Sequence, residues 1–256
     1  MTATDRTIVV VRDPEVLAEA VAARLLTRLI DGQAVRGQAS MVLTGGGVGI
    51  AALAAVARSP ARAAVDWRRV DVWWGDERFV PTGDPERNER QARQALLDDL
   101  DLDQDRVHPM GALGGVDGDD PDAAAARYAD ELRAAAPPGF AVPPFDVLLL
   151  GMGAEGHTAS IFPESPAAHD ERLVVGVHGC PKPPPTRVSL GFAALCAARE
   201  VWLVVAGADK ATMVAMALSG AGRVQVPAAG VAGTAQTLWL LDEAAASALP
   251  RDLRRH

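Results

Sequence analysis

Residues 145–160 read FDVLLLGMGAEGHTAS, and this stretch does most to define the fold. The unbroken apolar run Val147–Leu150 predicts a strand that is covered on both faces, as in a parallel sheet flanked by helices. Glycines follow at positions 151, 153 and 156 and let the backbone come close to a ligand. A buried strand leading into such a turn indicates the ligand-binding edge of an open α/β sheet.

Similar apolar runs recur along the chain, with longer amphipathic or alanine-rich segments between them. We predict strands at Thr7–Arg12, Ala39–Leu43, Val70–Trp74, Phe145–Leu150, Val174–Val177, Glu200–Val205 and Gln236–Leu241. Strands that alternate with helices predict an α/β fold with a doubly wound, mainly parallel sheet.

Helix starts are indicated where an aspartate precedes a proline, because the side chain can cap the helix and proline suits its first position. These pairs are Asp13-Pro14, Asp84-Pro85 and Asp120-Pro121. We expect the first helix to reach about Ile30 and stop at Gly32. A later helix, Lys210–Leu218, would be capped by Asp209.

The composition is that of a globular protein, with 256 residues, 49% of them hydrophobic and 23% charged. This length suits one α/β domain over residues 1–256. We find no apolar run near the roughly 20 residues that span a bilayer, no signal peptide after Met1, and too few cysteines for a disulfide framework. We therefore expect a cytoplasmic protein, and with no surface stripe that indicates an interface, a monomer.

The formal net charge of −8 makes the chain a poor candidate for binding nucleic acid, whose affinity depends on neutralising phosphates. A small anion needs only a local cluster of cations and backbone N–H groups. The charge therefore leaves a small anionic substrate open.

The predicted strand ending at Leu43 is followed by a glycine-rich turn, Thr44-Gly45-Gly46-Gly47-Val48-Gly49. Such a turn before a helix exposes backbone N–H groups and the positive end of the helix dipole, which together bind phosphate. A tight turn alone needs fewer glycines than these. Because no Gly-Lys-Ser/Thr follows, the turn is not a nucleoside triphosphate site.

Two further strand ends carry charged residues. Asp76, Glu77 and Arg78 follow Trp74, and they fit either a polar site or a solvated loop with a salt bridge. Lys210 lies in the first turn of a predicted helix, where a cation opposes the dipole, so we interpret it as a partner of a bound phosphate. Arg187 follows a proline-rich loop, and its place relative to the sheet stays open.

His157 lies one residue beyond Gly156, at the mouth of the strand that ends at Leu150. An imidazole has a pKa near neutrality and can take a proton from water and return it. Glu155 could orient the ring or stabilise its protonated form. We predict a catalytic role for His157 rather than surface decoration.

Residues 146–163, DVLLLGMGAEGHTASIFP, resemble the signature of the 6-phosphogluconolactonase family. Further blocks agree in the same order: the glycine loop at 44–47, WGDERFVP at 74–81, RVSL at 187–190 and GADKA at 207–211. The resemblance implies a Rossmann-like α/β/α sandwich shared with glucosamine-6-phosphate deaminases. It implies hydrolysis of 6-phospho-D-glucono-1,5-lactone to 6-phosphogluconate, in the oxidative pentose phosphate pathway, without metal or cofactor.

The resemblance also implies roles for individual residues. His157 would be the main acid/base residue, with Glu155 and Asp76 beside it. The substrate would contact Thr44, Gly45, Gly46, Gly47, Arg78, Gly153, Arg187 and Lys210. Two departures from the family pattern are Glu155, where an aspartate is usual, and Gly47-Val48-Gly49, where a hydroxyl residue and a proline are common.

These residues suggest a mechanism without a covalent intermediate. Neutral His157 would take a proton from water, the water would attack the lactone carbonyl, and His157 would then protonate the departing ring oxygen. Backbone N–H groups of the glycine turns, or Arg78, would stabilise the oxyanion. Ser160 lies nearby but lacks the G-x-S-x-G elbow of a serine nucleophile.

Three alternative functions share some of these sequence features. Gly151, Gly153 and Gly156 match the G-x-G-x-x-G pattern of dinucleotide-binding oxidoreductases, but Pro163 would break the helix that must follow. An amino-sugar-phosphate isomerase or deaminase of the same fold would carry a glutamate soon after the histidine, whereas the first carboxylate here is Glu164. A non-catalytic sugar-phosphate sensor would need a DNA-binding module, for which the chain has no spare segment.

Overall fold

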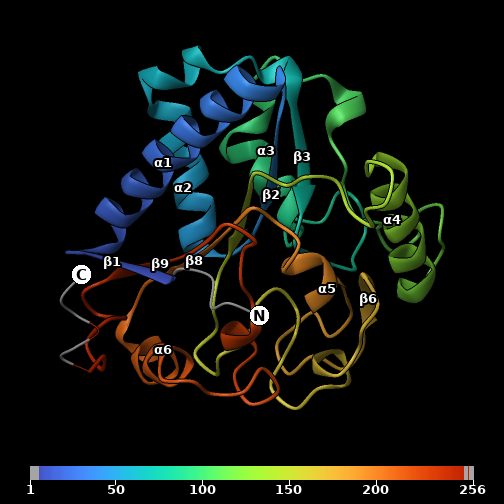
Figure 1. Ribbon diagram of the computed structural model, residues 1–256. Coiled ribbons are helices and arrows are strands. Elements are labelled where there is room, and N and C mark those ends of the chain that lie inside the picture. Colours follow the sequence, from blue (N-terminus) through green and yellow to red (C-terminus); the bar gives the residue numbers. More distant parts are fainter. Residues whose placement is uncertain (1–5, 251–252, 254–256) are drawn as a thin grey trace.

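The computed structural model in Figure 1 describes residues 6–250 and residue 253, and its main sheet has six strands. Their order is β1 (Arg6–Val11), β9 (Gln236–Asp242), β8 (Glu200–Val205), β5 (Val147–Leu150), β2 (Ala39–Leu43) and β3 (Val70–Trp74). Every pairing in this sheet is parallel. The predicted doubly wound parallel sheet is confirmed, with strand ends shifted by one or two residues.

A second, three-stranded antiparallel sheet was not predicted. It contains β4 (Asp76–Arg78), β7 (Arg187–Leu190) and β6 (Val174–Val177), in that order. The strand at Val174–Val177 is confirmed, but it belongs to this sheet and not to the parallel one. In the pairing of β4 with β7, Arg78 lies opposite Arg187. The small sheet therefore brings together polar residues that are far apart in the sequence.

The α-helices are α1 (Pro14–Arg36), α2 (Gly47–Arg58), α3 (Asn88–Ala95), α4 (Pro121–Ala135), α5 (Phe192–Leu195) and α6 (Ala211–Leu218). Short 3₁₀ helices are η1 (Pro60–Ala64), η2 (Trp67–Arg69), η3 (Leu97–Asp99), η4 (Gln104–Arg106), η5 (Pro166–Ala168), η6 (Ala208–Lys210) and η7 (Pro227–Gly230). In Figure 1, α1 and α2 lie above β1, β9 and β8, and α6 lies below them. Helix layers on both sides of the sheet confirm the predicted sandwich.

Three predicted helix ends were wrong. α1 begins after Asp13, whose carboxylate accepts the N–H of Val16 (2.8 Å), but it continues past Gly32 to end at Gly37, where φ is 74°. Asp84 accepts the N–H of Glu86 in a turn, so α3 starts only at Asn88. Asp209 lies inside η6 and caps no helix, and α6 begins at Ala211.

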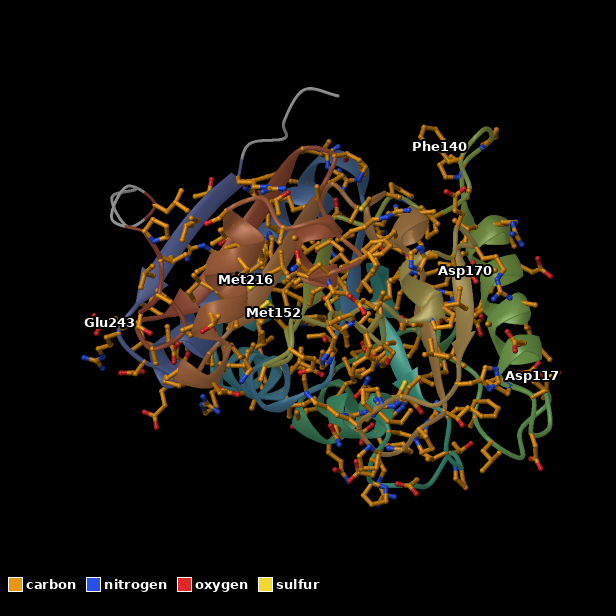
Figure 2. All side chains as sticks on the ribbon, turned by 90° about the horizontal axis from the view of Figure 1, so that it is seen from below. Asp117, Phe140, Met152, Asp170, Met216 and Glu243 are labelled. Atoms are coloured by element: carbon orange, nitrogen blue, oxygen red, sulfur yellow. The ribbon has the colours of Figure 1, made fainter. Side chains whose placement is uncertain are left out.

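The strand order places the site. From β2 the chain moves to β3 on one side and later returns to β5 on the other, so the carboxyl ends of β2 and β5 lie next to each other. Ligands of open α/β sheets bind at such a switch point. The turn after β5 includes Met152, which lies near the middle of the molecule in Figure 2, whereas the exposed Phe140 lies at its rim.

Tyr128 of α4 links that helix to the end of β3. Its hydroxyl oxygen accepts the backbone N–H of Trp74 (3.0 Å) and lies 3.2 Å from the carbonyl oxygen of His108. We expect Tyr128→Phe to lower the free energy of unfolding by about 1–3 kcal/mol, because a buried N–H loses its partner. Urea denaturation followed by tryptophan fluorescence measures this loss, and an unchanged midpoint and slope would contradict it.

Between residues 6 and 250, and at residue 253, the helices are all too short or too polar to cross a lipid bilayer.

Candidate active site

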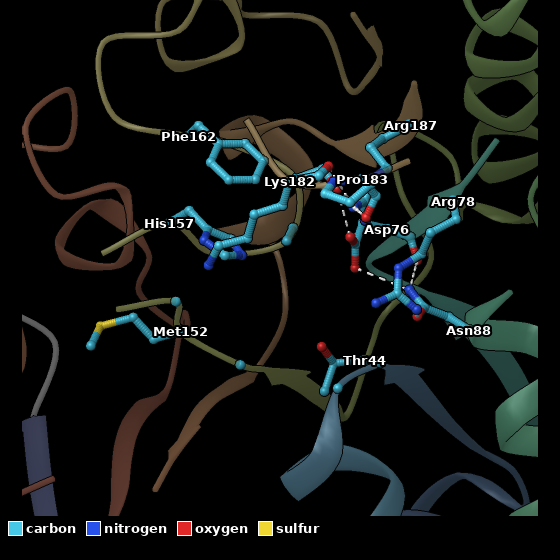
Figure 3. A pocket seen from close by; sticks show the side chains of 16 residues that line it. Thr44, Asp76, Arg78, Asn88, Met152, His157, Phe162, Lys182, Pro183 and Arg187 are labelled. Atoms are coloured by element: carbon cyan, nitrogen blue, oxygen red, sulfur yellow. Dashed lines mark hydrogen bonds between the residues drawn. The ribbon is translucent and has the colours of Figure 1, made fainter. Parts of the chain in front are cut away.

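A cavity of about 260 Å³ opens at the switch point. It is lined by Thr44, Gly45, Gly46, Asp76, Arg78, Asn88, Gly151, Met152, Gly153, His157, Ala159, Ser160, Phe162, Lys182, Pro183 and Arg187. These residues come from the segments after β2, β3 and β5, from the start of α3, and from the loop that enters β7 (Figure 3). Eight of the eleven residues predicted for the site therefore share one cavity: Thr44, Gly45, Gly46, Asp76, Arg78, Gly153, His157 and Arg187.

The other three predicted residues do not line the cavity. Gly47 is the first residue of α2, and Glu155 lies behind His157, to which it is hydrogen bonded. Lys210 forms an ion pair with the adjacent Asp209 at 3.0 Å. The structure thus does not bring Lys210 to the cavity, and a neighbouring carboxylate already offsets the cation at this helix start.

His157 is held from two sides. Its Nδ1 lies 2.9 Å from Oε1 of Glu155, which leaves Nε2 for a ligand. The Phe162 ring stacks on the imidazole, with centroids 4.4 Å apart and planes 25° from parallel. A side chain at position 153 would place its Cβ 2.1 Å from Nδ1, so any residue other than glycine would displace the imidazole. These contacts fix the imidazole plane at the cavity wall.

Lys182 extends this arrangement into a chain of three charged or ionisable groups. Its Nζ donates to Oε2 of Glu155 at 2.9 Å, while the other oxygen of Glu155 faces His157. Figure 3 shows the Lys182 side chain running beside the imidazole. Burial alone raises the pKa of Glu155, but the hydrogen bond from Lys182 and the neighbouring His157 outweigh it, so the pKa lies below its usual value.

Burial is the main cause that lowers the pKa of His157 below its usual value, and the positive charge of Lys182 adds to it. The carboxylate of Glu155 opposes both effects without overcoming them. His157 is therefore neutral at pH 7, as a general base must be. Because the pKa is lowered, His157 keeps its unprotonated form further into the acid range than an ordinary imidazole does.

The chain contains two lysines, Lys182 and Lys210, which allows a matched comparison. We expect Lys182→Met to raise the pKa of His157, because a nearby positive charge is removed. Lys210→Met should leave it unchanged, since Lys210 is paired with Asp209. An NMR titration of the His157 ring measures both values. Equal shifts in the two variants, or none in either, would show that the charge of Lys182 does not influence the pKa of His157 as proposed.

The opposite wall of the cavity suits an anion. Thr44, Gly45 and Gly46 lead directly into α2, and Gly46 occupies the N-cap position with φ 82°, a value that favours glycine. No side chain caps the first N–H groups of α2. Open N–H groups at the positive end of a helix are a binding site for phosphate.

Arg78 and Asn88 form the side of this wall. Nη1 of Arg78 donates to Oδ1 of Asn88 (2.6 Å) and to the carbonyl oxygen of Glu86 (2.8 Å). Nδ2 of Asn88 donates to the carbonyl oxygen of Asp76 (2.8 Å). A Cβ at position 45 would lie 1.9 Å from Oδ1 of Asn88, so any residue other than glycine there would displace the Asn88 side chain.

Asp76 and Arg187 complete the lining. A carboxylate oxygen of Asp76 accepts the hydroxyl proton of Ser160 at 2.7 Å, and both side chains are buried. Arg187 is also buried and donates to the carbonyl oxygens of Pro184 (2.7 Å) and Pro183 (3.0 Å). Burial lowers the pKa of Arg187, although Asp76 opposes this. The guanidinium therefore fixes the loop that carries Lys182 and also adds positive charge to the cavity.

Sequence reasoning missed Asn88 and Lys182. Neither follows a strand of the parallel sheet: Asn88 begins α3, and Lys182 lies in the proline-rich loop 179–185. The available signal was the position of Lys182 five residues before Arg187.

Among the described residues, no group of three or more histidine, cysteine, aspartate or glutamate side chains is arranged to hold a metal ion.

Comparison with known proteins identifies the family to which the chain belongs. The family model described as glucosamine-6-phosphate isomerases/6-phosphogluconolactonase matches residues 12–239. The chain belongs to this family. This confirms the resemblance seen in the sequence.

Relatives within the family are similar over nearly the whole chain. A 6-phosphogluconolactonase of Streptomyces coelicolor is 63% identical over 249 residues, which cover 96% of this chain and 95% of that protein. One of Mycobacterium tuberculosis is 50% identical, covering 93% and 96%. The solved 6-phosphogluconolactonase of Trypanosoma brucei superposes with a TM-score of 0.82 at 29% identity, covering 97% of this chain and all of that one. A monomeric glucosamine-6-phosphate deaminase, at 18% identity and a TM-score of 0.75, shares the fold.

Proposed function

We propose that this protein hydrolyses 6-phospho-D-glucono-1,5-lactone to 6-phosphogluconate. The observation that carries the proposal is one cavity with a neutral, oriented His157 on one wall and an uncapped helix N-terminus beside Arg78 on the other. The first wall supplies acid/base chemistry, and the second supplies an anion site. A phosphorylated lactone needs both. The names of the relatives support the same reaction.

The phosphate lies against the N–H groups at the start of α2, with Arg78 and Arg187 as counter-charges. Arg78, which lines the cavity, thus takes the phosphate-binding role that the sequence had suggested for Lys210. The sugar ring then extends toward His157, and its carbonyl lies beside Nε2. Binding through a remote phosphate holds the reacting carbon in place, which is worth several orders of magnitude in rate.

In the reaction, neutral His157 takes a proton from water as the water oxygen attacks the carbonyl carbon. Lys182 and Glu155 keep Nδ1 in place during this step. The oxyanion is stabilised by Lys182, since an ammonium has three N–H bonds and Glu155 takes one of them. The N–H of Gly153 is not available for this task, because it donates to the carbonyl oxygen of His157 at 3.0 Å. His157 then protonates the ring oxygen as the C–O bond breaks.

The test compares the phosphorylated lactone with unphosphorylated glucono-1,5-lactone, with spontaneous hydrolysis subtracted. We expect kcat/KM to be higher for the phosphorylated compound by about 10²-fold or more. The unphosphorylated lactone would lack at least two charge-assisted hydrogen bonds that the phosphate makes in the proposed site. Equal values for the two lactones would reject the anion site. No acceleration of either would reject the function.

The alternatives lack support in the geometry. The segment after Gly156 forms turns and an isolated bridge between Thr158 and Ile161 instead of the helix that a dinucleotide site requires. No carboxylate occurs at positions 158–163, where a deaminase would use one. Release of ammonia from glucosamine 6-phosphate by the purified protein would favour the deaminase.

We further propose that the chain acts as a single-domain, cytoplasmic monomer without cofactor or nucleic-acid partner. The net charge of −8 argues against a nucleic-acid partner, and the length and composition fit one globular domain. Light scattering of the purified protein tests the oligomeric state.

A further inference from the structure

Glu77 is a fully buried carboxylate that the proposed reaction does not use. It is the central residue of β4 and is 0% exposed. Oε1 accepts the backbone N–H groups of Arg78 (2.8 Å) and Asn88 (2.7 Å). Oε2 accepts the N–H of Glu89 (2.9 Å). One carboxylate therefore satisfies three backbone donors in two separate segments.

Two of these donors belong to the first turn of α3. The first N–H groups of a helix have no partner within the helix and need a cap. The N-cap residue of α3, Arg87, makes no capping bond with its side chain. The carboxylate of Glu77, from a strand eleven residues earlier, takes the place of the local cap, and its negative charge suits the helix N-terminus.

This contact fixes the residues that form one wall of the cavity. Asn88, held by its N–H to Glu77, accepts from Nη1 of Arg78 and fits against Gly45. Arg78 is held by its own N–H to the same oxygen. A shift of α3 relative to β4 would move both side chains away from the start of α2.

We propose that Glu77 is a positioning residue: it holds Arg78, and Asn88 which contacts Arg78, so that Arg78 can bind the phosphate group of the substrate. The proposal rests on the proposed function for the identity of the ligand. Glu77 acts through these two residues and does not itself touch the substrate. Its loss should weaken binding of phosphorylated ligands and spare the chemical step at His157.

The groups around Glu77 determine the pH at which its role should be tested. Arg87 is 1% exposed, lies 3.6 Å from Glu77, and donates to the carbonyl oxygen of Met110 (2.8 Å). Burial raises the pKa of Glu77 to about 7, although Arg87 and the backbone N–H groups oppose the shift. Measurements at pH 8 therefore examine the charged carboxylate, with all three N–H bonds in place.

The main variant is Glu77→Gln, which keeps the shape but turns an amide NH₂ toward a helix N–H. Glu89→Gln is the matched control, because Glu89 lies on the same helix and faces the same Arg87 (3.5 Å), yet its carboxylate binds Arg93 (2.8 Å). We expect Glu77→Gln to weaken binding of 6-phosphogluconate, measured by calorimetry at pH 8, by about 10-fold or more. KM for the phosphorylated lactone should rise in proportion, with kcat and the rate on unphosphorylated lactone retained. Glu89→Gln should resemble the wild type.

The possible results separate the two proposals. If the wild type does not hydrolyse the phosphorylated lactone, the proposed function is wrong. If the wild type is active and Glu77→Gln binds 6-phosphogluconate normally, or loses kcat on both lactones equally, the positioning role is wrong. Should Glu77→Gln fail to fold, Glu77→Asp replaces it: this variant keeps the charge opposite Arg87 and withdraws the carboxylate from α3. Normal binding by a folded Glu77→Asp would overturn the proposal in the same way.

Discussion

His157→Ala is expected to lower kcat for the phosphorylated lactone by about 10²–10⁴-fold, the usual contribution of a positioned acid/base group. The imidazole is the group that both activates water and protonates the leaving oxygen in the proposed reaction. KM should change little, because the residues proposed to bind the phosphate line another part of the cavity. The measurement is initial-rate kinetics with spontaneous hydrolysis subtracted.

A suitable control is His169→Ala, since His169 is exposed and does not line the cavity. It should retain the wild-type kcat. If His157→Ala keeps more than about a tenth of the wild-type kcat, general acid/base catalysis by this residue is excluded. A parallel loss in the His169 variant would point to an effect on folding.

Arg78→Met is expected to raise KM for the phosphorylated lactone by about 10- to 100-fold while kcat changes little. Hydrogen bonds to a charged group contribute about 1.5–3 kcal/mol each, and methionine keeps much of the aliphatic stem while removing the guanidinium. The rate on unphosphorylated lactone should stay near the wild-type value. A raised KM with an unchanged kcat is typical of losing an interaction that is equally strong in the bound substrate and in the transition state.

The matched control is Arg68→Met, at an arginine whose side chain is 67% exposed and which precedes the amino end of β3, away from the cavity. It should leave both constants unchanged. An Arg78→Met enzyme with normal KM and reduced kcat would instead place Arg78 beside the reacting carbonyl, and the substrate would then lie the other way round.

The parallel sheet could be predicted because its strands carry a strong local signal. Val147–Leu150 and Val201–Val205 are apolar at successive positions, and both strands are buried along their length. The strands β4 and β7 gave no such signal. Asp76–Arg78 is three residues long and polar, and it is a strand only because β7 pairs with it. Pairing between strands that are distant in the sequence cannot be inferred from the residues of one short segment.

The candidate site was predicted where residues directly follow strands of the parallel sheet. Thr44–Gly46, Asp76 and His157 all follow that rule and share the cavity. Lys210 follows the rule as well but does not line the cavity. The prediction for Lys210 considered the helix dipole and left out the carboxylate of Asp209, one residue earlier, which pairs with the lysine. Lys182 and Asn88 reach the cavity from a loop and from a helix start. Asn88 is held there by Glu77, eleven residues earlier in the chain, and the loop of Lys182 is held by Arg187, five residues later. Neither contact follows from the strand pattern on which the prediction of the site depended.

The proposed reaction requires one cavity to hold the phosphate at the start of α2 and the reacting carbon beside His157. A crystal structure with bound 6-phosphogluconate tests this requirement most directly. We expect phosphate oxygens on the N–H groups after Gly45 and on Arg78, with the product carboxylate about 3–3.5 Å from Nε2 of His157. A phosphate bound at Lys210, or a carboxylate remote from His157, would contradict it.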